Sequence, residues 1–400
     1  MTDSSDADCE MLKRLRDAPE LFAAIAERRE ESELAKQQRL RAQWPDDLLR
    51  AALTLAELRE RAASKFTRAD RMWFDRTGLE QATPEPVARW KATRFAAKGS
   101  GEPVWDLCSG IGGDVLALAE HLPIVSFDTS PVQNLRAVWN AEVYGVAEHV
   151  TTRNVDVTTL DDIPGYVHCD PDRRAGLSGR ARRLEDYVPP LDWLQGLTER
   201  VRGGAIKVGP ASNFGGKFPD AEIELISLDG ECKEATIWFG ELCQPGQYHA
   251  TVLPAGQTVI GHPLENLASR SGLKTYLYDP DPAVVRAGLV ERIAEDLGLS
   301  RLDEAEEYLT GDTLIDSPFV SPFRVVAELP KRPRDLRDWF RKSDFGQLEI
   351  KCRHVPVRAE ELRSQLPLPG NQPGVLFVAR VAGKTTMIAA ERPPTTRGGL

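Results

Sequence analysis

The chain has 400 residues, of which 41% are hydrophobic and 28% charged, a composition typical of a water-soluble folded protein with two or three domains. Its formal net charge of -10 argues against a protein that coats nucleic acid with its whole surface, although a local basic face can still bind phosphates. The sequence has no apolar run of the ~20 residues that a membrane span needs, no signal-peptide pattern and no Cys-x-x-Cys pair, so we expect a cytoplasmic protein with reduced thiols and without a metal site.

Residues 1–98 predict an N-terminal helical subdomain. Residues 1–10 are polar and acidic and are expected to fray, whereas apolar residues recur at helical spacing from about residue 11 to residue 65. Thr83 followed by Pro84 predicts the N-cap and first residue of a further helix. Gln81 comes just before this start, where it either meets a ligand of the following domain or belongs to a capping turn.

The sequence from 104 to 119 predicts a strand, a tight turn and a helix. Gly110, Gly112 and Gly113 leave the backbone of the turn bare where a ligand could approach closely. Val115 stands where the dinucleotide-binding fingerprint needs a third glycine, and no Gly-Lys-Ser/Thr follows. The turn is therefore neither a dinucleotide-binding motif nor a P-loop.

This turn resembles the first motif of class I S-adenosylmethionine (SAM) methyltransferases, in which an acid is followed by small residues on alternate positions. The matching residues are Asp106, Cys108, Gly110 and Gly112. Cys108 departs from the pattern, because Gly or Ala is commoner there. The resemblance implies SAM binding by this turn, including Gly113, and the alternative is a glycine-rich turn of another α/β protein.

Strand and helix patterns alternate within residues 99–250, which predict a methyltransferase domain. Strands are expected at 104–107, 124–127, 150–153, 166–169, 205–208, 223–227 and 235–239, and helices at 113–121, 131–144 and about 189–202. The last two strands form a closing hairpin. This order predicts a doubly wound α/β sheet, mostly parallel with one antiparallel strand, similar to the Rossmann-like seven-stranded sheet of class I methyltransferases.

Acidic residues follow the predicted strands, at the edge where open α/β sheets bind ligands. Asp106 ends the first strand, and Asp128 ends the second, where a carboxylate can accept both ribose hydroxyls of an adenosine. Asp156 follows the third strand and can accept from the adenine amino group. Acids at strand ends also cap helices, but in this order they match the methyltransferase cofactor site.

The fourth predicted strand ends in Asp170-Pro171, which resembles a motif of nucleobase methyltransferases. The resemblance implies that Asp170 holds the target nitrogen in line with the methyl group and that Pro171 fixes the loop. The family pattern continues with Pro and an aromatic residue, whereas this chain continues with Asp172, Arg173 and Arg174. The two arginines favour a substrate with a phosphate or a guanine edge, and the alternative is a solvated basic loop.

Lys207 interrupts the fifth predicted strand, between Ile206 and Val208. A lysine at this place either points into the site or extends its ammonium past the end of the sheet into water. We expect the second arrangement, because a lysine can pack its stem on apolar surface while it keeps its charge hydrated.

Residues 251–322 predict a helical connector, with a helix that opens at Asp279-Pro-Asp-Pro282. Residues 323–395 predict a small α+β domain in the order β-α-β-α-β-β, with elements at 323–329, 333–342, 347–352, 359–366, 375–380 and 385–390. The stretch 331–358 carries nine Lys or Arg and four Asp or Glu, a net charge of +5. Cations such as Arg337 and Arg341 therefore predict contact with nucleic acid, unless they form a solvated helix face.

Residues 40–395 as a whole resemble bacterial class I methyltransferases with a C-terminal THUMP-like domain. The motifs that carry the resemblance lie at 79–83, 106–113, 170–174, 278–283 and 345–351. It implies a ferredoxin-like or THUMP-like C-terminal fold, SAM as the cofactor, with Gln81 at its methionine end, and structured RNA as the partner. We expect SAM-dependent methylation of a base in tRNA or rRNA; the alternatives are a methyltransferase for a small molecule or a protein, and an RNA-binding protein whose fold has lost activity.

Overall fold

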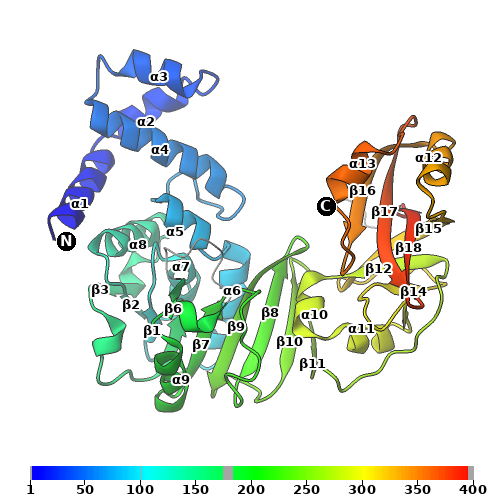
Figure 1. Cartoon of the computed structure of the whole chain (residues 1–400). Helices are drawn as coiled ribbons and strands as arrows, with labels where there is room; N and C mark the ends of the chain where they lie inside the picture. Colours follow the sequence, from blue (N-terminus) through cyan, green and yellow to red (C-terminus); the bar gives the residue numbers. More distant parts are fainter. Residues whose placement is uncertain (1, 100, 174–182, 395–400) are drawn as a thin grey trace. The chain divides into compact units, whose positions relative to one another are not determined.

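The computed structural model describes residues 2–99, 101–173 and 183–394, which divide into two compact units (Figure 1). The first unit comprises Met1–Glu222 and Lys233–Gly246, and the second comprises Ile223–Cys232 and Gln247–Leu400. The chain therefore passes from one unit to the other three times.

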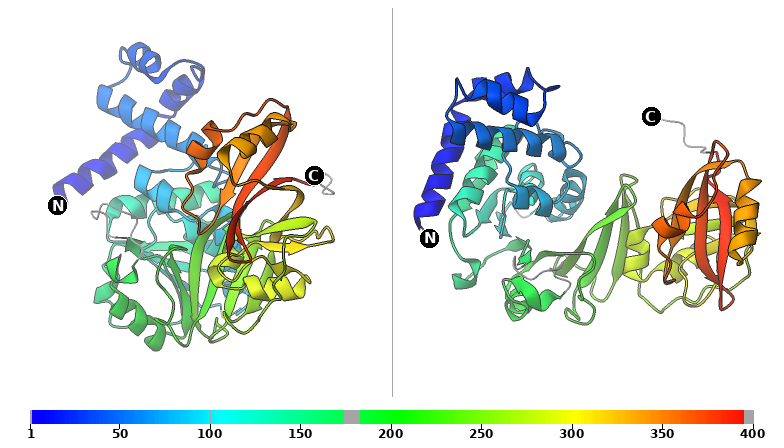
Figure 2. Two further views of the ribbon diagram at one scale, coloured as in Figure 1. Left: turned by 45° about the vertical axis from the view of Figure 1, so that its right-hand side comes forward. Right: turned by 45° about the horizontal axis from the view of Figure 1, so that its top comes forward.

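The N-terminal part of the first unit is helical, as predicted. Its helices are α1 (Thr2–Arg16), α2 (Pro19–Ala26), α3 (Glu33–Leu40), α4 (Asp46–Ala62), α5 (Arg76–Gln81) and α6 (Glu85–Ala96). Helices α1, α2 and α3 all contact α4, and both views of Figure 2 show these four helices as one group. The expectation that residues 1–10 fray is wrong, because buried Leu12 and Leu15 pack α1 against α4 and α8 (Pro131–Tyr144) and the helix extends back to Thr2.

A doubly wound sheet forms the rest of the first unit. Its strands are β1 (Val104–Leu107), β2 (Ile124–Phe127), β3 (Val150–Arg153), β4 (Tyr166–Cys169), β7 (Gly203–Val208) and β9 (Glu231–Gly240). They lie in the order β9-β7-β4-β1-β2-β3, and β9 is antiparallel to β7 while the others run parallel. The predicted sheet with one antiparallel strand is thus confirmed.

The helices of this sheet follow its strands along the chain. Helix α7 (Gly113–Ala119) packs on β2, α8 on β3, and α9 (Leu191–Arg200) on β7. The shorter elements are β5 (Asp172–Arg173) and β6 (Tyr187–Val188), which pair with each other, and the 3-10 turns η1 (Ala147–His149), η2 (Val157–Thr159) and η3 (Leu184–Asp186). Because the chain runs outward from β1 to β3 and then returns to β4 beside β1, the carboxyl ends of β1 and β4 are the switch point where such sheets bind ligands.

The second unit begins with three strands, β8 (Glu222–Leu228), β10 (Tyr248–Leu253) and β11 (Gln257–Gly261). Strand β10 runs parallel to β8 and antiparallel to β11. Of these, β8 was predicted, whereas β10 crosses the expected end of the methyltransferase domain at residue 250 and β11 lies within the predicted helical connector. Proline and glycine residues stand close to both ends of β10 and β11. The residues of β10 can be recognised as a strand only once its pairing with β8 is known.

The prediction of a helical connector at 251–322 is wrong, because this region contains strands as well as helices. Besides α10 (Pro282–Ala287) and α11 (Val290–Asp296), this region contains β11, β12 (Tyr276–Pro280), β13 (Ser300–Arg301) and β14 (Leu309–Gly311). The helix starts as expected, since the Asp281 side chain accepts from Ala283 N at 2.8 Å. Gly288 then ends α10 with a φ of 72°, which breaks the single predicted helix into two.

The C-terminal α+β order is confirmed. Its elements are β15 (Val320–Leu329), α12 (Pro333–Arg341), β16 (Phe345–Cys352), α13 (Ala359–Ser364), β17 (Gln372–Val381) and β18 (Lys384–Glu391). The sheet runs β13-β14-β12-β15-β18-β17-β16, and Leu336 and Phe340 of α12 pack in its core with Leu348 and Leu376. The opposite face of α12 is left to its charged residues.

Candidate active site

The turn between β1 and α7 depends on left-handed backbone conformations. The φ angles are 64° at Cys108, 54° at Gly110 and 87° at Gly112. A Cβ on Gly112 would also lie 3.2 Å from the Cβ of Ala137 on α8, so glycine is required there on two grounds. Cys108 adopts the left-handed region with a side chain, which explains why this position favours glycine in the motif that the turn resembles.

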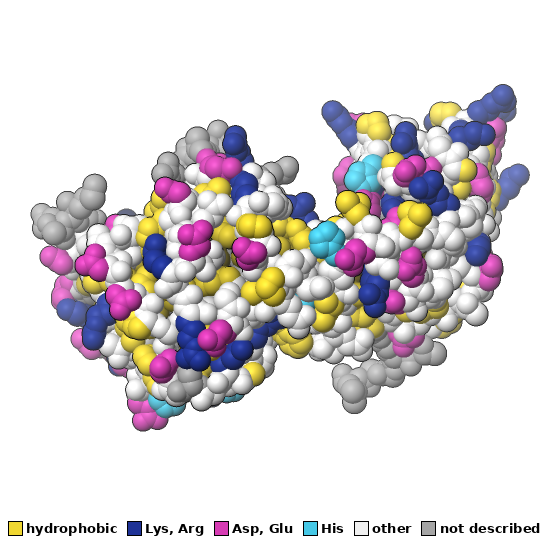
Figure 3. Space-filling model, turned by 90° about the horizontal axis from the view of Figure 1, so that it is seen from below, with side chains coloured by type: hydrophobic (Ala, Val, Ile, Leu, Met, Phe, Trp, Pro, Cys, Tyr) yellow, Lys and Arg dark blue, Asp and Glu magenta, His cyan; other side chains and the backbone are white. Residues whose placement is uncertain are grey.

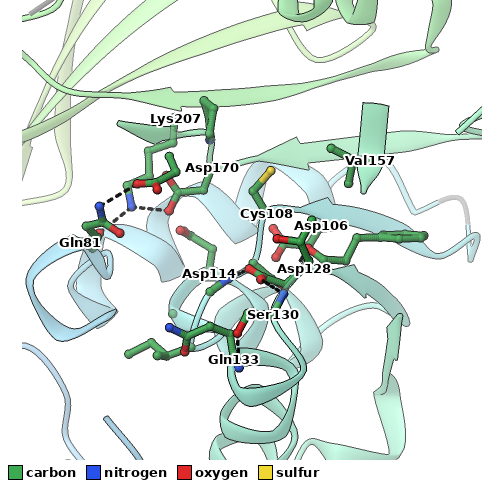
Figure 4. A pocket seen from close by; sticks show the side chains of 18 of the residues that line it. Gln81, Asp106, Cys108, Asp114, Asp128, Ser130, Gln133, Val157, Asp170 and Lys207 are labelled. Carbon is green, nitrogen blue, oxygen red and sulfur yellow. Dashed lines mark hydrogen bonds and ion pairs between the residues drawn. The ribbon is translucent and has the colours of Figure 1, made fainter. Parts of the chain in front are cut away.

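A cavity of about 630 Å³ lies at the carboxyl ends of β1 and β4 (Figure 4). Among the residues that line it are nine predicted site residues, Gln81, Asp106, Cys108, Gly110, Gly113, Asp128, Asp156, Asp170 and Pro171. Gly112 shapes the turn without lining the cavity. Arg173 lies on β5, Arg174 lies outside the described residues, and Arg337 and Arg341 belong to the second unit.

Asp128 braces the glycine turn from the end of β2. Its Oδ2 accepts from Gly110 N at 2.9 Å and its Oδ1 accepts from Ser130 N at 2.8 Å. Burial raises the pKa of Asp128, and these two backbone donors partly offset that effect. Because each carboxylate oxygen can accept two hydrogen bonds, both oxygens can still accept from ribose hydroxyls.

Asp106 and Asp156 differ in what they offer the cavity. The Asp106 carboxylate is buried and lies 2.6 Å from Nδ1 of His168, so one of its oxygens is already engaged. Asp156 is exposed, and its Oδ1 accepts from the backbone N–H and the hydroxyl of Thr158. Asp156 can therefore meet a ligand directly, whereas Asp106 acts mainly through the histidine beside it.

A buried charge network extends from the wall of the cavity inward and is centred on Lys91 of α6. Its Nζ is 2.8 Å from Oδ1 of Asp114 on α7, 2.8 Å from Oε1 of Glu234 on β9 and 3.3 Å from Nε2 of His168 on β4. The Thr83 hydroxyl donates to Asp114 at 2.7 Å. Thr83 is thus not the predicted N-cap, since α6 begins at Glu85 after Pro84 and the Thr83 side chain is used for this buried carboxylate.

These contacts set the charges of the network. Burial opposes the ionised forms of Lys91 and Asp114, but their mutual attraction outweighs it and holds the pKa of Lys91 above and that of Asp114 below the usual range. Burial also lowers the pKa of His168, but Asp114 and Asp106 outweigh this and raise it above its usual value. These contacts therefore favour the charged forms of Lys91, Asp114 and His168.

Asp170, at the end of β4, is paired with Lys207 of β7. The Lys207 Nζ lies 2.7 Å from Oδ2 of Asp170 and donates to the carbonyl oxygen of Gln81 at 2.9 Å. The expectation that Lys207 extends into water is wrong, because its side chain is only 9% exposed and turns toward the carboxylate. Figure 4 shows Lys207, Gln81 and Asp170 pointing toward one another.

Sequence reasoning missed Lys91, Asp114, His168 and Glu234 as parts of this site, and misjudged Lys207. Three of them carry a local signal. His168 and Lys207 stand among apolar neighbours in fully buried strands, and Lys91 lies on the apolar, buried face of α6. An ionisable residue in such a position needs a partner. The sequence does not say which partner, since the pairs join residues 23 to 143 positions apart.

Neither a cluster of metal ligands nor a membrane-spanning helix occurs in the part of the chain that the structure describes. Among these residues, no three His, Cys, Asp or Glu side chains are grouped so that they could hold a metal ion. No described helix is long and apolar enough to cross a membrane.

Two family profiles match parts of the chain. One, described as THUMP domain-like, matches residues 320–392, and another, described as RNA cap guanine-N2 methyltransferase, matches residues 101–185. The second range includes both the glycine turn and the Asp170-Pro171 motif. Trimethylguanosine synthase of Schizosaccharomyces pombe is 32% identical over 82 residues, which are 20% of this chain and 34% of that protein.

Two relatives cover most of the chain. They are uncharacterized S-adenosylmethionine-dependent methyltransferases from two strains of Mycobacterium tuberculosis, each 33% identical over 348 residues, 83% of this chain and 93% of the relative. The crystal structure of a candidate methyltransferase from Porphyromonas gingivalis W83 superimposes with a TM-score of 0.68 at 19% identity, covering 88% of this chain and 92% of that chain. This likeness shows the class I methyltransferase fold.

We expect Lys91→Met to destabilise the first unit strongly. The variant leaves Asp114 and Glu234 buried without their shared cation, which typically costs about 3–5 kcal/mol. Urea unfolding, followed by circular dichroism, measures the loss. Lys98→Met removes an exposed lysine from the same segment and should change stability by less than about 0.5 kcal/mol. Equal effects of the two substitutions would contradict the role of Lys91.

Proposed function

Because the chain belongs to the family of S-adenosylmethionine-dependent methyltransferases represented in Mycobacterium tuberculosis, we propose that it methylates the N2 amine of guanine in a structured RNA. The observation that carries this proposal is the Asp170-Pro171-Asp172 segment at the rim of the cavity, beside the glycine turn. The match of residues 101–185 to the cap guanine-N2 methyltransferase profile supports the same acceptor. The THUMP domain-like match at 320–392 supports RNA as the partner.

The cavity has the features that SAM requires. Asp128 can accept the ribose hydroxyls, Asp156 can accept from the adenine amino group, and the bare backbone at Gly110 has no atom within 4 Å of where a Cβ would stand. Its volume of about 630 Å³ lies in the range of small-molecule sites, ~300–1,000 Å³. When bound, the cofactor supplies a methyl group on a positively charged sulfur.

Guanine fits the acids of the motif better than adenine does. Guanine presents two neighbouring donors, N1–H and the N2 amine, on its Watson–Crick edge, and a carboxylate only accepts. Asp170 and Asp172 therefore suit this edge, whereas adenine offers an acceptor beside its amine. Arg173 and Arg174 are proposed to bind the acceptor nucleotide through its O6 and N7 edge or its phosphate.

Asp170 is the residue that we assign to the reacting nitrogen. It accepts a hydrogen bond from N2 and so directs the nitrogen toward the methyl group, while Pro171 restricts the backbone beside it. When N2 takes up the methyl group that the bound cofactor would supply, one N2 proton passes to the Asp170 carboxylate and then to water. Burial raises the pKa of Asp170, despite the opposing Lys207, which favours this transfer.

The test is nucleoside analysis of RNA methylated by the purified protein. Total RNA from a strain that lacks the gene is incubated with SAM, digested and analysed by mass spectrometry. We expect N2-methylguanosine with the wild-type protein and at least about 10²-fold less with Asp170→Ala, although the variant still binds S-adenosylhomocysteine. Asp162→Ala, an exposed aspartate elsewhere in the unit, should behave as wild type. A methyl group on another atom, or only on protein or small molecules, would overturn the proposal.

We expect Asp128→Ala to weaken binding of S-adenosylhomocysteine by about tenfold to a hundredfold. The loss corresponds to about 1.5–3 kcal/mol for hydrogen bonds to a charged group. Isothermal titration calorimetry measures it. The matched control is Asp161→Ala, which removes an exposed aspartate that does not line the cavity. Unchanged affinity of the Asp128 variant would exclude the ribose assignment.

The second unit is proposed to bind RNA through the exposed cations around α12. Lys331, Arg332, Arg334, Arg337, Arg341 and Lys342 are all exposed, while Leu336 and Phe340 hold the helix to the sheet. On the face drawn in Figure 3, cationic and anionic side chains are interspersed. Phosphate binding therefore requires a local group of cations, such as the group around α12. Arg341 contacts Asp338, and Arg337 donates to Pro333 O at 3.2 Å.

Charge reversal of Arg337 and Arg341 should weaken RNA binding and reduce its salt dependence. Losing two phosphate contacts lowers the slope of log K against log salt by about 1–2, while affinity for S-adenosylhomocysteine stays the same. Filter binding at several salt concentrations measures the slope. Reversal of Arg39 and Arg50, two exposed arginines of the first unit, matches the change in net charge. Equal slopes for the two double variants would leave 331–358 as a solvated helix face.

A further inference from the structure

Lys207 extends from β7 into the cavity, and groups from two other parts of the chain hold its ammonium. Its Nζ is 2.7 Å from Oδ2 of Asp170 and 2.9 Å from the carbonyl oxygen of Gln81. The side chain is largely buried, so these contacts replace water around the charge. These two contacts therefore fix the direction of the Lys207 side chain.

The side chain of Gln81 continues these contacts to the second acid of the motif. Its Nε2 donates to Oδ1 of Asp172 at 2.9 Å. Asp170 and Asp172 flank Pro171. Lys207 contacts the first of these acids and Gln81 contacts the second, so each acid is held by a residue outside the motif. Helix α5, which ends at Gln81, is itself anchored because the Asp75 side chain accepts from Gly78 N at 2.8 Å.

We propose that Lys207 and Gln81 are positioning residues for methyl transfer, which fix Asp170 and Asp172 so that both carboxylates face the donor edge of the acceptor base. The inference rests on the proposed function. Lys207 contacts one oxygen of Asp170, and among the described residues no side chain donates to the other, which leaves it for the acceptor. Lys207 remains an ammonium throughout and does not act as a base.

The charge of Lys207 matters as well as its hydrogen bond. Burial alone would lower the pKa of Lys207, but the carboxylates around it, Asp170 first among them, raise it above its usual value. The charged groups around Asp170 come from several elements: Lys207 on β7, Asp106 on β1, Asp114 on α7 and His168 on β4, with Lys91 on α6 and Glu234 on β9 behind them. Asp172 follows two positions along the chain on β5.

Loss of the ammonium should change the protonation of Asp170. Burial raises the pKa of Asp170, and Lys207 is the group that opposes this most. Without Lys207, the pKa rises further, and the carboxyl stays neutral up to a higher pH. A neutral carboxyl presents a donor where the acceptor nitrogen needs an acceptor, so activity should be lost at the acidic end of the pH range.

The experiment compares three substitutions of Lys207 in the full-length protein. Arg keeps the charge, Gln keeps a donor without charge, and Met keeps neither. We expect Lys207→Met to lower kcat by about 10–100-fold and to move the acidic limb of kcat upward by about one pH unit or more. Lys207→Gln should show the pH shift with a smaller loss of kcat, and Lys207→Arg should retain the wild-type profile. Affinity for S-adenosylhomocysteine should stay within about threefold of wild type.

A matched substitution tests Gln81. Gln81→Leu removes the donor to Asp172 and should reduce kcat or raise KM for RNA, without weakening S-adenosylhomocysteine binding. Loss of S-adenosylhomocysteine affinity instead would assign Gln81 to the cofactor and overturn its part of the proposal. Lys217→Met is the control for the lysine series, because Lys217 pairs with Glu185 and does not line the cavity.

The outcomes separate this inference from the proposed function. Every variant is assayed on the nucleoside that the wild-type protein methylates, whichever atom that is. If Lys207→Met and Lys207→Gln keep the wild-type kcat and pH profile, the positioning role is overturned even when N2-methylguanosine is formed. If the methyl group appears elsewhere, the guanine assignment fails while the comparison of Lys207 variants still stands. A Lys207 variant that unfolds is recognised by its thermal melt, and the other two Lys207 variants then decide whether the positioning role holds.

Discussion

Three buried carboxylates, Asp106, Asp114 and Glu234, lie in the wall of the cavity or behind it, and the ammonium of Lys91 is the cation that two of them share. Removing a carboxylate from water costs several kcal/mol unless a cation and hydrogen bonds replace the water. Lys91 supplies that cation to Asp114 and Glu234 and contacts His168, which in turn holds Asp106. The helix before the sheet, the helix after the glycine turn, and two strands are thus joined by charge at one point.

The same arrangement is repeated closer to the ligand. Lys207 pairs with Asp170 as Lys91 pairs with Asp114, but Asp170 keeps 29% of its side chain exposed where Asp114 keeps 7%. The Lys91–Asp114 pair is almost fully shielded from solvent and stabilises the fold. The Lys207–Asp170 pair is open to the cavity on one side, which leaves space for the proposed acceptor to complete its hydrogen bonds. A site that holds its acids in this way spends little of the acceptor's binding energy on ordering them.

The sequence was sufficient for the succession of strands along the chain in the first unit and for the acids at their ends. Asp128, Asp156 and Asp170 could be assigned to one rim because parallel strands bring their carboxyl ends together, whatever the rest of the fold does. The role of Lys207 could not be predicted, because a lysine at a strand end turns to solvent or to a carboxylate according to a partner 37 residues away. Strands β10 and β11 were not predicted, for a similar reason. Short strands between prolines and glycines are defined by their pairing more than by their sequence pattern.

The three passages of the chain between the units affect how the protein can have been assembled in evolution. Ile223–Cys232 belongs with the C-terminal part of the chain, while Lys233–Gly246 returns to the N-terminal part. A single recombination point near residue 250 would separate β8 from β10, its parallel neighbour. A C-terminal part gained or lost at a single point near residue 250 would therefore lack the segment 223–232, which belongs to the same unit.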